Sequence, residues 1–210
     1  VRASHGSCPA CIEANAPRRS HPSSSYKPSY PGRLVHADIA GPFVRSTHGH
    51  FQYLLMITDD HSRFKVCLFL QQKSDAPAQM RRFVATFNAL LNKRGEQPAR
   101  VVGSLHCDNA GEFLSREFKD FLDHELISQT TCPPHVHQLN GVAERSIRTT
   151  MESARAHLVA ANAPISFWNY AVAHAVDVNN RTSGPPDSEA SSYEHLTGER
   201  PRVLNIMPFG

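Results

Sequence analysis

The stretch Leu34-Val-His-Ala-Asp-Ile-Ala40 alternates apolar and polar residues well enough to predict a β-strand that carries an acid, Asp38. A second apolar run, Val101-Val-Gly-Ser-Leu-His-Cys107, is followed at once by another acid, Asp108, and then by strand-breaking residues. A third acid, Glu144, falls in the first turn of a clearly helical pattern. Acids at two strand ends and one helix start suit a site for divalent metal, because hard cations prefer oxygen ligands. Phosphodiester chemistry commonly uses two such ions about 3.5–4 Å apart.

Three carboxylates can also be unrelated, since the chain has 19 Asp and Glu among 210 residues. An Asp after a strand is often a turn residue that accepts backbone hydrogen bonds. The sequence around each acid distinguishes this triple. The three blocks are His36-Ala-Asp-Ile-Ala-Gly-Pro-Phe43, Asp108-Asn-Ala-Gly-Glu-Phe113 and Gln138-Leu-Asn-Gly-Val-Ala-Glu-Arg145. They resemble the catalytic blocks of integrases from copia-type LTR retrotransposons, in the DDE group that includes retroviral integrases, and the resemblance runs from about Cys8 to Gly210.

The resemblance implies an α/β protein with the RNase H-like fold, a mixed five-stranded sheet flanked by helices. It implies a polynucleotidyl transferase that processes the 3′ ends of element cDNA and joins them to target DNA. Asp38 would bridge two Mg²⁺ or Mn²⁺ ions, Asp108 would bind one of them and Glu144 the other. The implied partners are element-end DNA, target DNA and further copies of the chain, and the implied location is the nucleus after a cytoplasmic particle stage.

Two alternatives from other classes remain open. One is a domesticated, inactive relative that only binds DNA or a partner, and the other is an RNase H-type nuclease that uses the same metal chemistry. The intact trio of acids argues against the first alternative. The block Asn140-Gly-Val-Ala-Glu-Arg145 argues against the second. Glu112 also matches the family pattern, and we expect it to be a helix-start or supporting group rather than a metal ligand.

Hydrophobic periodicity predicts the elements of the core. The expected strands cover residues 34–39, 53–58, 64–70, 101–107 and 126–130. The expected helices run from Ser74 until Gly95, over 115–124, from Gly141 past Leu158, and over 165–181. Asp59 and Asp60 are predicted to close a hairpin turn rather than to bind metal, and Trp168 is predicted to be a packing residue.

The helix from Gly141 is predicted to have two different faces. An apolar stripe of Ala143, Ile147, Ala154 and Leu158 would pack against the core. Glu144, Arg148 and Arg155 fall within about 40° of one another on the helix, with Arg145 on the adjoining side. The alternatives are an ordinary Glu-Arg ion pair on a solvated face or a surface whose guanidinium groups bind phosphate. We favour DNA binding by Arg145, Arg148 and Arg155, and the resemblance adds Asn140.

Residues 1–32 are expected to be the tail of an N-terminal zinc-binding module followed by a linker, since 17–31 is rich in Pro and Ser. Cys8 and Cys11 have the spacing of a zinc-binding pair, but a structural site needs four ligands. The resemblance places the missing histidines before Val1. We therefore expect zinc only in the intact longer protein. The integrase core is expected over 33–183 and a post-core segment over 184–210.

Composition agrees with this interpretation without establishing it. The net charge is +3, and its excess lies in residues 1–37, which hold Arg2, Arg18, Arg19, Lys27 and Arg33 against the single acid Glu13. Such a segment could screen phosphates or be a solvated arm. Five Cys is an odd number, so reduced intracellular cysteines are expected rather than a disulfide framework. No stretch approaches the roughly 18–20 apolar residues of a membrane span, so we expect no membrane partner.

Overall fold

Five strands form one mixed sheet. They are β1 (Val35–Ala40), β2 (Tyr53–Asp59), β3 (Lys65–Leu70), β4 (Ser104–Cys107) and β5 (Ser128–Thr131). Their order is β3-β2-β1-β4-β5; β1, β2 and β3 are antiparallel neighbours, and β4 and β5 run parallel to β1. The structure is a computed structural model that describes residues 28–92, 101–108, 111–131 and 141–210. It confirms the mixed five-stranded sheet flanked by helices.

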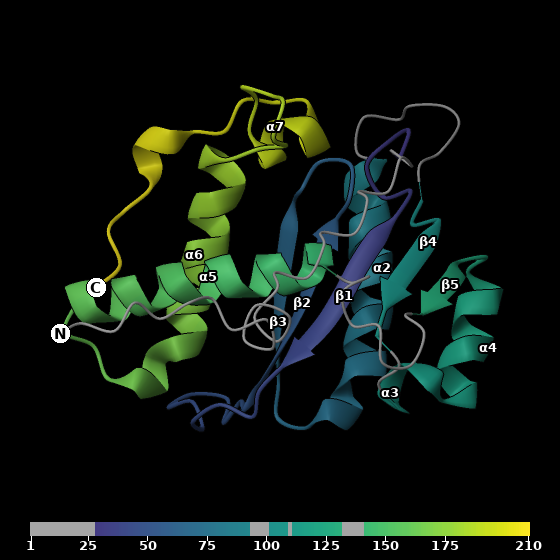
Figure 1. Cartoon of the computed structure of the whole chain (residues 1–210), viewed down its shortest axis with the longest axis horizontal. Coiled ribbons are helices and arrows are strands. Elements are labelled where there is room, and N and C mark those ends of the chain that lie inside the picture. Colours follow the sequence, from purple (N-terminus) through teal and green to yellow (C-terminus); the bar gives the residue numbers. More distant parts are fainter. Residues whose placement is uncertain (1–27, 93–100, 109–110, 132–140) are drawn as a thin grey trace, which may run out of the picture.

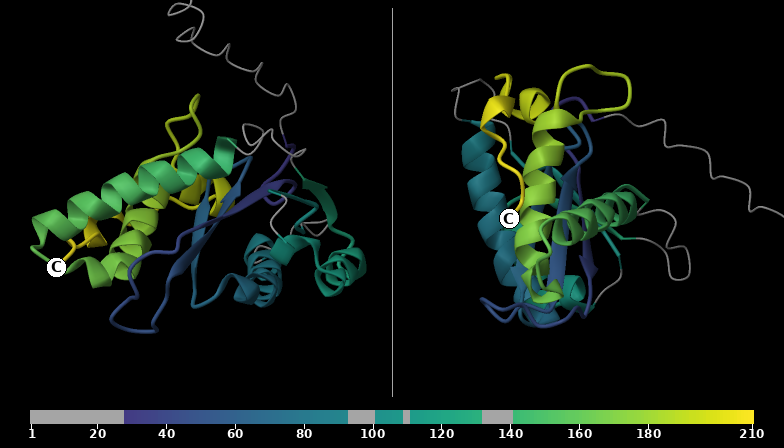
Figure 2. Two further views of the ribbon diagram at one scale, coloured as in Figure 1. Left: turned by 60° about the horizontal axis from the view of Figure 1, so that its bottom comes forward. Right: turned by 90° about the vertical axis from the view of Figure 1, so that its left-hand side faces the viewer.

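Helices cover both faces of this sheet (Figures 1 and 2). They are α2 (Ala76–Leu91), α3 (Gly111–Leu114), α4 (Arg116–His124), α5 (Gly141–Ala160), α6 (Trp168–Thr182) and α7 (Ser192–Thr197), with 3₁₀ turns η1 (Lys73–Asp75), η3 (Ile165–Phe167) and η4 (Val203–Asn205). Figure 1 shows α5 and α6 in front of the sheet and α2 behind it. Within the described residues, no helix is both long and apolar enough to cross a membrane.

Successive side chains of a strand point to opposite faces of the sheet, so the interior is divided into two cores. In β2, Leu55 and Ile57 belong to the core under α2, α3 and α4, whereas Leu54 and Met56 belong to the core under α5 and α6. This is the period-two pattern of a strand that is buried on both faces. Trp168 lies in the second core, where its Nε1–H donates to the carbonyl of Val44 at 2.7 Å. The prediction that Trp168 is a packing residue is confirmed.

The hairpin turn between β2 and β3 also agrees with its prediction. Buried Asp59 accepts hydrogen bonds from the backbone N–H of Gly32 at 2.7 Å and from the N–H and hydroxyl of Ser62 at 2.7 and 2.6 Å. Asp60 accepts from His36 Nε2–H at 3.2 Å and forms an ion pair with Arg63 at 3.0 Å. Both carboxylates are therefore used to hold the turn.

Two strands are shorter than their apolar runs suggested. The run 101–107 joins the sheet only from Ser104, because the N–H of Val102 donates to Asn88 Oδ1 and that of Gly103 to the carbonyl of Gly32. The last strand begins at Ser128 because Ile127 is used to end α4, donating its N–H to the carbonyl of Leu122.

Two helix boundaries also differ from the prediction. Helix α2 ends at Leu91 rather than near Gly95, because Asn92 caps it by donating both its N–H and its side-chain amide to the carbonyl of Asn88. The helix expected over 165–181 begins with the 3₁₀ turn η3. Helices α3 and α7 were not predicted, because four and six residues are too few for a clear periodicity.

Candidate active site

The register of two parallel strands places Asp38 beside Asp108. Ala37 of β1 pairs with Cys107 of β4, and Asp38 and Asp108 are the next residues of their segments. Neighbouring parallel strands point matched side chains to the same face. The two acids that lie 70 residues apart in the sequence therefore meet on adjacent segments in the middle of the sheet.

The third acid reaches the same place from the helix layer. Asp38 lies opposite Met56 of β2, whose side chain is in the core under α5 and α6, so Asp38 faces that helix layer too. Helix α5 packs across β1 and β2. Glu144 lies in the first turn of α5, at the end of the helix nearest β1 (Figure 1). Its side chain is exposed.

Electrostatics shows that the three acids interact. The pKa of Asp38 is raised from 3.8 to about 6, chiefly by burial and then by the negative charge of Asp108, and Glu144 raises it further. The N–H of Ile39, which donates to Asp38 Oδ1 at 2.8 Å, and the charge of Lys73 act in the opposite direction. Burial and the two neighbouring charges thus make the ionised form of Asp38 costly, and a bound cation would offset this cost.

The three acids meet only some of the requirements of a metal site. The donors are the carboxylate oxygens that Mg²⁺ and Mn²⁺ prefer, and their mutual repulsion is the kind that a divalent cation relieves. Within the described ranges, however, no three His, Cys, Asp or Glu side chains lie close enough together to hold an ion. Asp108 and Glu144 both act on Asp38 through their charges, and the role of the three acids as a ligand set stays a prediction.

A row of polar side chains behind the acids was not predicted. His36 and His106 precede Asp38 and Asp108 by two residues, so each lies on the same face as its acid, and the two rings contact edge-on with centroids 5.4 Å apart. His106 Nδ1 lies 2.8 Å from the hydroxyl of Thr130. Although burial opposes it, the hydrogen bond from His36 and the charge of Arg63 hold the pKa of Asp60 below its usual value.

The period-two spacing of these histidines from the two acids was visible in the sequence. It could have shown that the acids continue a polar row on one face of the sheet.

Helix α5 carries arginines that are available for a ligand. Arg145, Arg148 and Arg155 are exposed, and none of them takes part in the ion pairs formed among described residues. In particular, Glu144 and Arg148 do not form the i,i+4 pair that was the alternative interpretation. The opposite side of the helix packs as expected, with Ala143, Ala154 and Leu158 buried and Ile147 partly so.

Several predicted residues lie outside the described residues, namely Cys8, Cys11 and Asn140. Glu112 lies in the first turn of α3, which agrees with a helix-start position.

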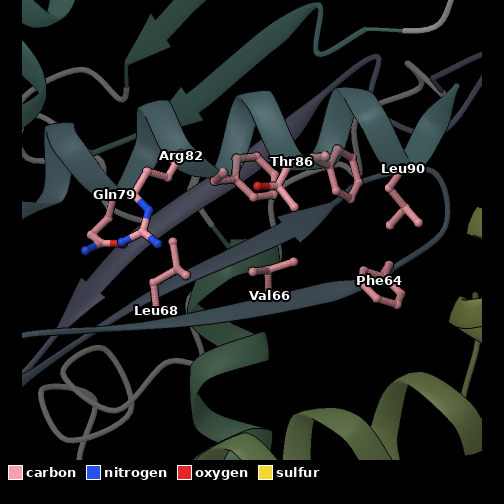
Figure 3. A pocket seen from close by; sticks show the side chains of 9 residues that line it. Phe64, Val66, Leu68, Gln79, Arg82, Thr86 and Leu90 are labelled. Atoms are coloured by element: carbon pink, nitrogen blue, oxygen red, sulfur yellow. The ribbon is translucent and has the colours of Figure 1, made fainter. Parts of the chain in front are cut away.

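An apolar cavity of about 260 Å³ lies elsewhere, between β3 and α2 (Figure 3). Its walls include Val66 and Leu68 of β3 and Phe83 and Phe87 of α2, which belong to the core under α2. Because Asp38 faces α5 and α6, this cavity is on the other side of the sheet. It is not part of the acidic site.

Known proteins resemble the chain in sequence. It is 32% identical over 199 residues to the retrovirus-related Pol polyprotein from transposon TNT 1-94 of Nicotiana tabacum, with 90% of this chain and 14% of the relative covered. It is 28% identical over 204 residues to the Pol polyprotein from transposon RE1 of Arabidopsis thaliana, with 97% and 13% covered. The chain therefore spans about one seventh of the length of these relatives.

Solved structures share its fold. The simian T-cell lymphotropic virus intasome in complex with PP2A regulatory subunit B56 gamma matches with a TM-score of 0.66 at 18% identity, over 93% of this chain and 64% of the other. The magnesium complex of the HTLV-2 integrase catalytic core domain in its trimeric form matches with a TM-score of 0.58 at 16% identity, over 81% and 99%. The sheet order and helix layers are thus those of the RNase H-like retroviral integrase cores.

The family model described as the integrase core domain matches residues 28–137, which include Asp38 and Asp108. These residues make up just over half of the chain, and the chain belongs to the integrase core domain family.

Proposed function

We propose that this chain is the catalytic core of a retrotransposon integrase, which processes the 3′ ends of element cDNA and joins them to target DNA. The observation that carries the proposal is the strand register that places Asp38 beside Asp108 under α5, the helix that carries Glu144; burial and both of these charges raise the pKa of Asp38. A partly buried cluster of like charges is costly unless a cation joins it. The similarity to copia-type Pol polyproteins supports the choice of substrate.

Two Mg²⁺ or Mn²⁺ ions are proposed as cofactors. The donor chemistry fits them, and the HTLV-2 integrase core was solved with magnesium. Asp38 would contact both ions, Asp108 one and Glu144 the other. Bound ions would supply charge stabilisation to the attacking and leaving oxygens. The protein holds Asp38 on the central strand β1 and Asp108 directly after the neighbouring strand β4, so the sheet restricts the positions of both acids.

The arginines of α5 that form no ion pair among the described residues are proposed to bind DNA phosphates. Arg145 and Arg148 lie within one turn of Glu144, so a phosphate held by either would lie close to the acids. A guanidinium group binds phosphate through two parallel hydrogen bonds. Arg155 would extend this contact about two turns further along the helix.

Assembly with further copies of the chain is part of the proposal. The HTLV-2 core was solved in trimeric and dimeric forms, and the simian viral protein in an intasome. We propose that several copies of this chain likewise assemble on element-end DNA. The assembly would act in the nucleus.

The test uses a branched oligonucleotide that mimics an end already joined to target DNA. A lone core of this type is expected to catalyse at least the reverse reaction, so the 210-residue chain is incubated with this DNA and Mg²⁺ or Mn²⁺. Glu144→Gln should lower the rate at least a hundredfold, because it removes a ligand charge but keeps size and helix propensity. Joining itself is measured with the longer protein.

Glu152→Gln is the matched control, since Glu152 is an exposed acid two turns further along α5. It should keep the wild-type rate. Wild-type activity in Glu144→Gln would refute the proposed mechanism and favour a module that only binds DNA. Faster cleavage of an RNA–DNA hybrid than of the branched DNA would favour a nuclease instead.

A further inference from the structure

Lys65 begins β3 and faces the same side of the sheet as Asp38. It pairs with Thr58 of β2, which in turn pairs with His36 of β1, two residues before Asp38. Cys67, two residues further along β3, packs against the core under α5 and α6, so the side chain of Lys65 points to that helix layer as well. Strand spacing puts Lys65 about 10 Å from Asp38 across the sheet and ~7 Å along it. The lysine and the acid therefore share one face of the sheet.

The side chain of Lys65 extends to helix α5. Its Nζ lies 3.5 Å from the hydroxyl of Thr149, which itself donates to the carbonyl of Arg145 at 2.9 Å. The hydroxyl of Thr58, beside Lys65 on the sheet, is buried and has no hydrogen-bond partner among the described residues, so the ammonium group is not folded back onto β2. The main chain of Lys65 is fixed by Asn180, whose amide accepts its N–H and donates to its carbonyl. Lys65 is thus anchored on β3 and presents its charge beside α5.

The charge of Lys65 has no acidic partner among the described residues. Lys65 takes part in none of their ion pairs. Of the acids on the two nearest helices, Glu152 of α5 does not pair with it and Asp177 of α6 pairs with Arg181 instead. Burial alone lowers the pKa of the Lys65 ammonium group, with no contribution from a neighbouring charge. A half-buried cation without a counter-ion is costly, and a bound anion would offset this cost.

Helix α5, which crosses the sheet in Figure 1, separates Lys65 from the third acid. At 100° per residue, Thr149 and Arg145 lie within about 40° of each other, whereas Glu144 lies about 140° around the helix from Thr149. Arg145 is exposed and forms no ion pair among the described residues. Lys65 therefore adds a second cation to the side of α5 that carries Arg145, across the helix from Glu144.

We propose that Lys65 binds a DNA phosphate on the side of α5 that carries Arg145, across this helix from the scissile phosphate at the acids. The inference rests on the proposed function. Thr149 stands about 8 Å from Glu144 along the helix axis, so DNA that reaches the acids and lies across α5 would pass Lys65. An ammonium group binds phosphate as a point charge. The contact would add affinity without reading the base sequence.

The experiment compares Lys65→Met, Lys65→Arg and the control Lys119→Met in the 210-residue chain. Methionine keeps most of the apolar stem of lysine and removes the charge. Lys119 is an exposed lysine of α4, on the face of the sheet away from Asp38. Affinity for the branched oligonucleotide is measured in Ca²⁺ by fluorescence anisotropy, between about 50 and 200 mM salt. The rate of the reverse reaction is measured against DNA concentration in Mg²⁺ or Mn²⁺, and Tm is measured by circular dichroism.

Lys65→Met should weaken DNA binding and raise KM about tenfold, because a hydrogen bond to a charged group is lost, with kcat nearly unchanged. It should also flatten the plot of log K against log salt by about 0.9, the value for one phosphate. Its Tm should be no lower than that of the wild type, because a half-buried charge is removed and the stem is kept. Lys65→Arg should keep the affinity and the salt slope, since it keeps the charge. Lys119→Met should match the wild type.

Equal affinity and equal salt slope in Lys65→Met and Lys119→Met would overturn the inference. A lower Tm of Lys65→Met with an unchanged salt slope would assign the lysine to the stability of the fold alone. A loss confined to kcat would overturn the inference too, because a phosphate contact that binds substrate must act on KM. If the wild type cuts no DNA with either metal while Lys65→Met still flattens the salt dependence, the proposed function fails but Lys65 remains a phosphate-binding residue.

Discussion

Removing the charge of Asp38 should stabilise the folded chain while it abolishes activity. The substitution Asp38→Asn keeps the shape of the side chain and an oxygen that can still accept the N–H of Ile39. It removes the repulsion from Asp108 and Glu144 and the cost of burying a charge. Metal-free wild-type protein and the variant are therefore expected to differ in stability, and the difference should depend on pH.

The magnitude follows from the pKa of Asp38, which rises from 3.8 to about 6 on folding. Each unit corresponds to ~1.4 kcal/mol, so the ionised carboxylate destabilises the fold by about 3 kcal/mol at most. Well below pH 4 the group is protonated in both the folded and the unfolded chain, and wild type and variant should be equally stable. Between pH 4 and pH 6 the free energy of unfolding of the wild type falls relative to that of Asp38→Asn. The reason is that Asp38 ionises freely in the unfolded chain but stays largely protonated in the folded chain. Above pH 7 the full difference should be present.

The assay is thermal unfolding followed by circular dichroism, in EDTA, at pH 4 and pH 8. For a chain of this length, 3 kcal/mol corresponds to about 6–12 °C in Tm. Mg²⁺ at ten times its Kd should then stabilise the wild type at pH 8 by about 1.4 kcal/mol, and it should stabilise Asp38→Asn much less. Glu152→Gln is the control for an acid outside the cluster.

Equal melting temperatures of wild type and Asp38→Asn at pH 8 in EDTA would refute the electrostatic argument. Equal stabilisation of both proteins by Mg²⁺ would show that the ion binds elsewhere. Neither measurement depends on catalysis. Both therefore test the metal site independently of the proposed reaction.

Three further predictions concern other parts of the chain. Asn180→Ala should destabilise the fold by about 1–3 kcal/mol in urea unfolding, because the buried amide accepts the N–H of Lys65 at 2.9 Å and donates to its carbonyl at 2.8 Å at the edge of the sheet; an unchanged midpoint would contradict this. Arg148→Ala should reduce the salt slope of DNA binding by about 0.9, and an unchanged slope would remove Arg148 from the DNA interface. The chain should retain no stoichiometric zinc after dialysis against a weak chelator, since Cys8 and Cys11 supply only two of four ligands, and retained zinc would show that other ligands complete the site.

The sequence predicted the sheet and most of the helices because their hydrophobic periods are long. The first three strands each begin and end within one residue of the predicted bounds. Prediction was weaker where tertiary hydrogen bonds redirect an apolar run. Val102 is buried and apolar, as a strand residue would be, but its N–H goes to Asn88 of α2 instead of to a neighbouring strand. No local pattern contains that information.

For the candidate site, the sequence identified the acids but did not give their arrangement. Asp38 and Asp108 could be chosen from the blocks around them, but their adjacency depends on the register of β1 and β4, which the sequence does not give.

The raised pKa of Asp38 also bears on the choice between an integrase and a module that only binds DNA. DNA is an anion, so a module that only binds it gains nothing from three acids that repel one another and the phosphates. An Asn at position 38 would keep the hydrogen bond from Ile39 and remove about 3 kcal/mol of destabilisation. The acids become useful only when a divalent cation joins them and links them to phosphate. The electrostatic cost at Asp38, together with arginines of α5 that form no ion pair among the described residues, therefore supports the proposal of metal-dependent chemistry on DNA over that of binding alone.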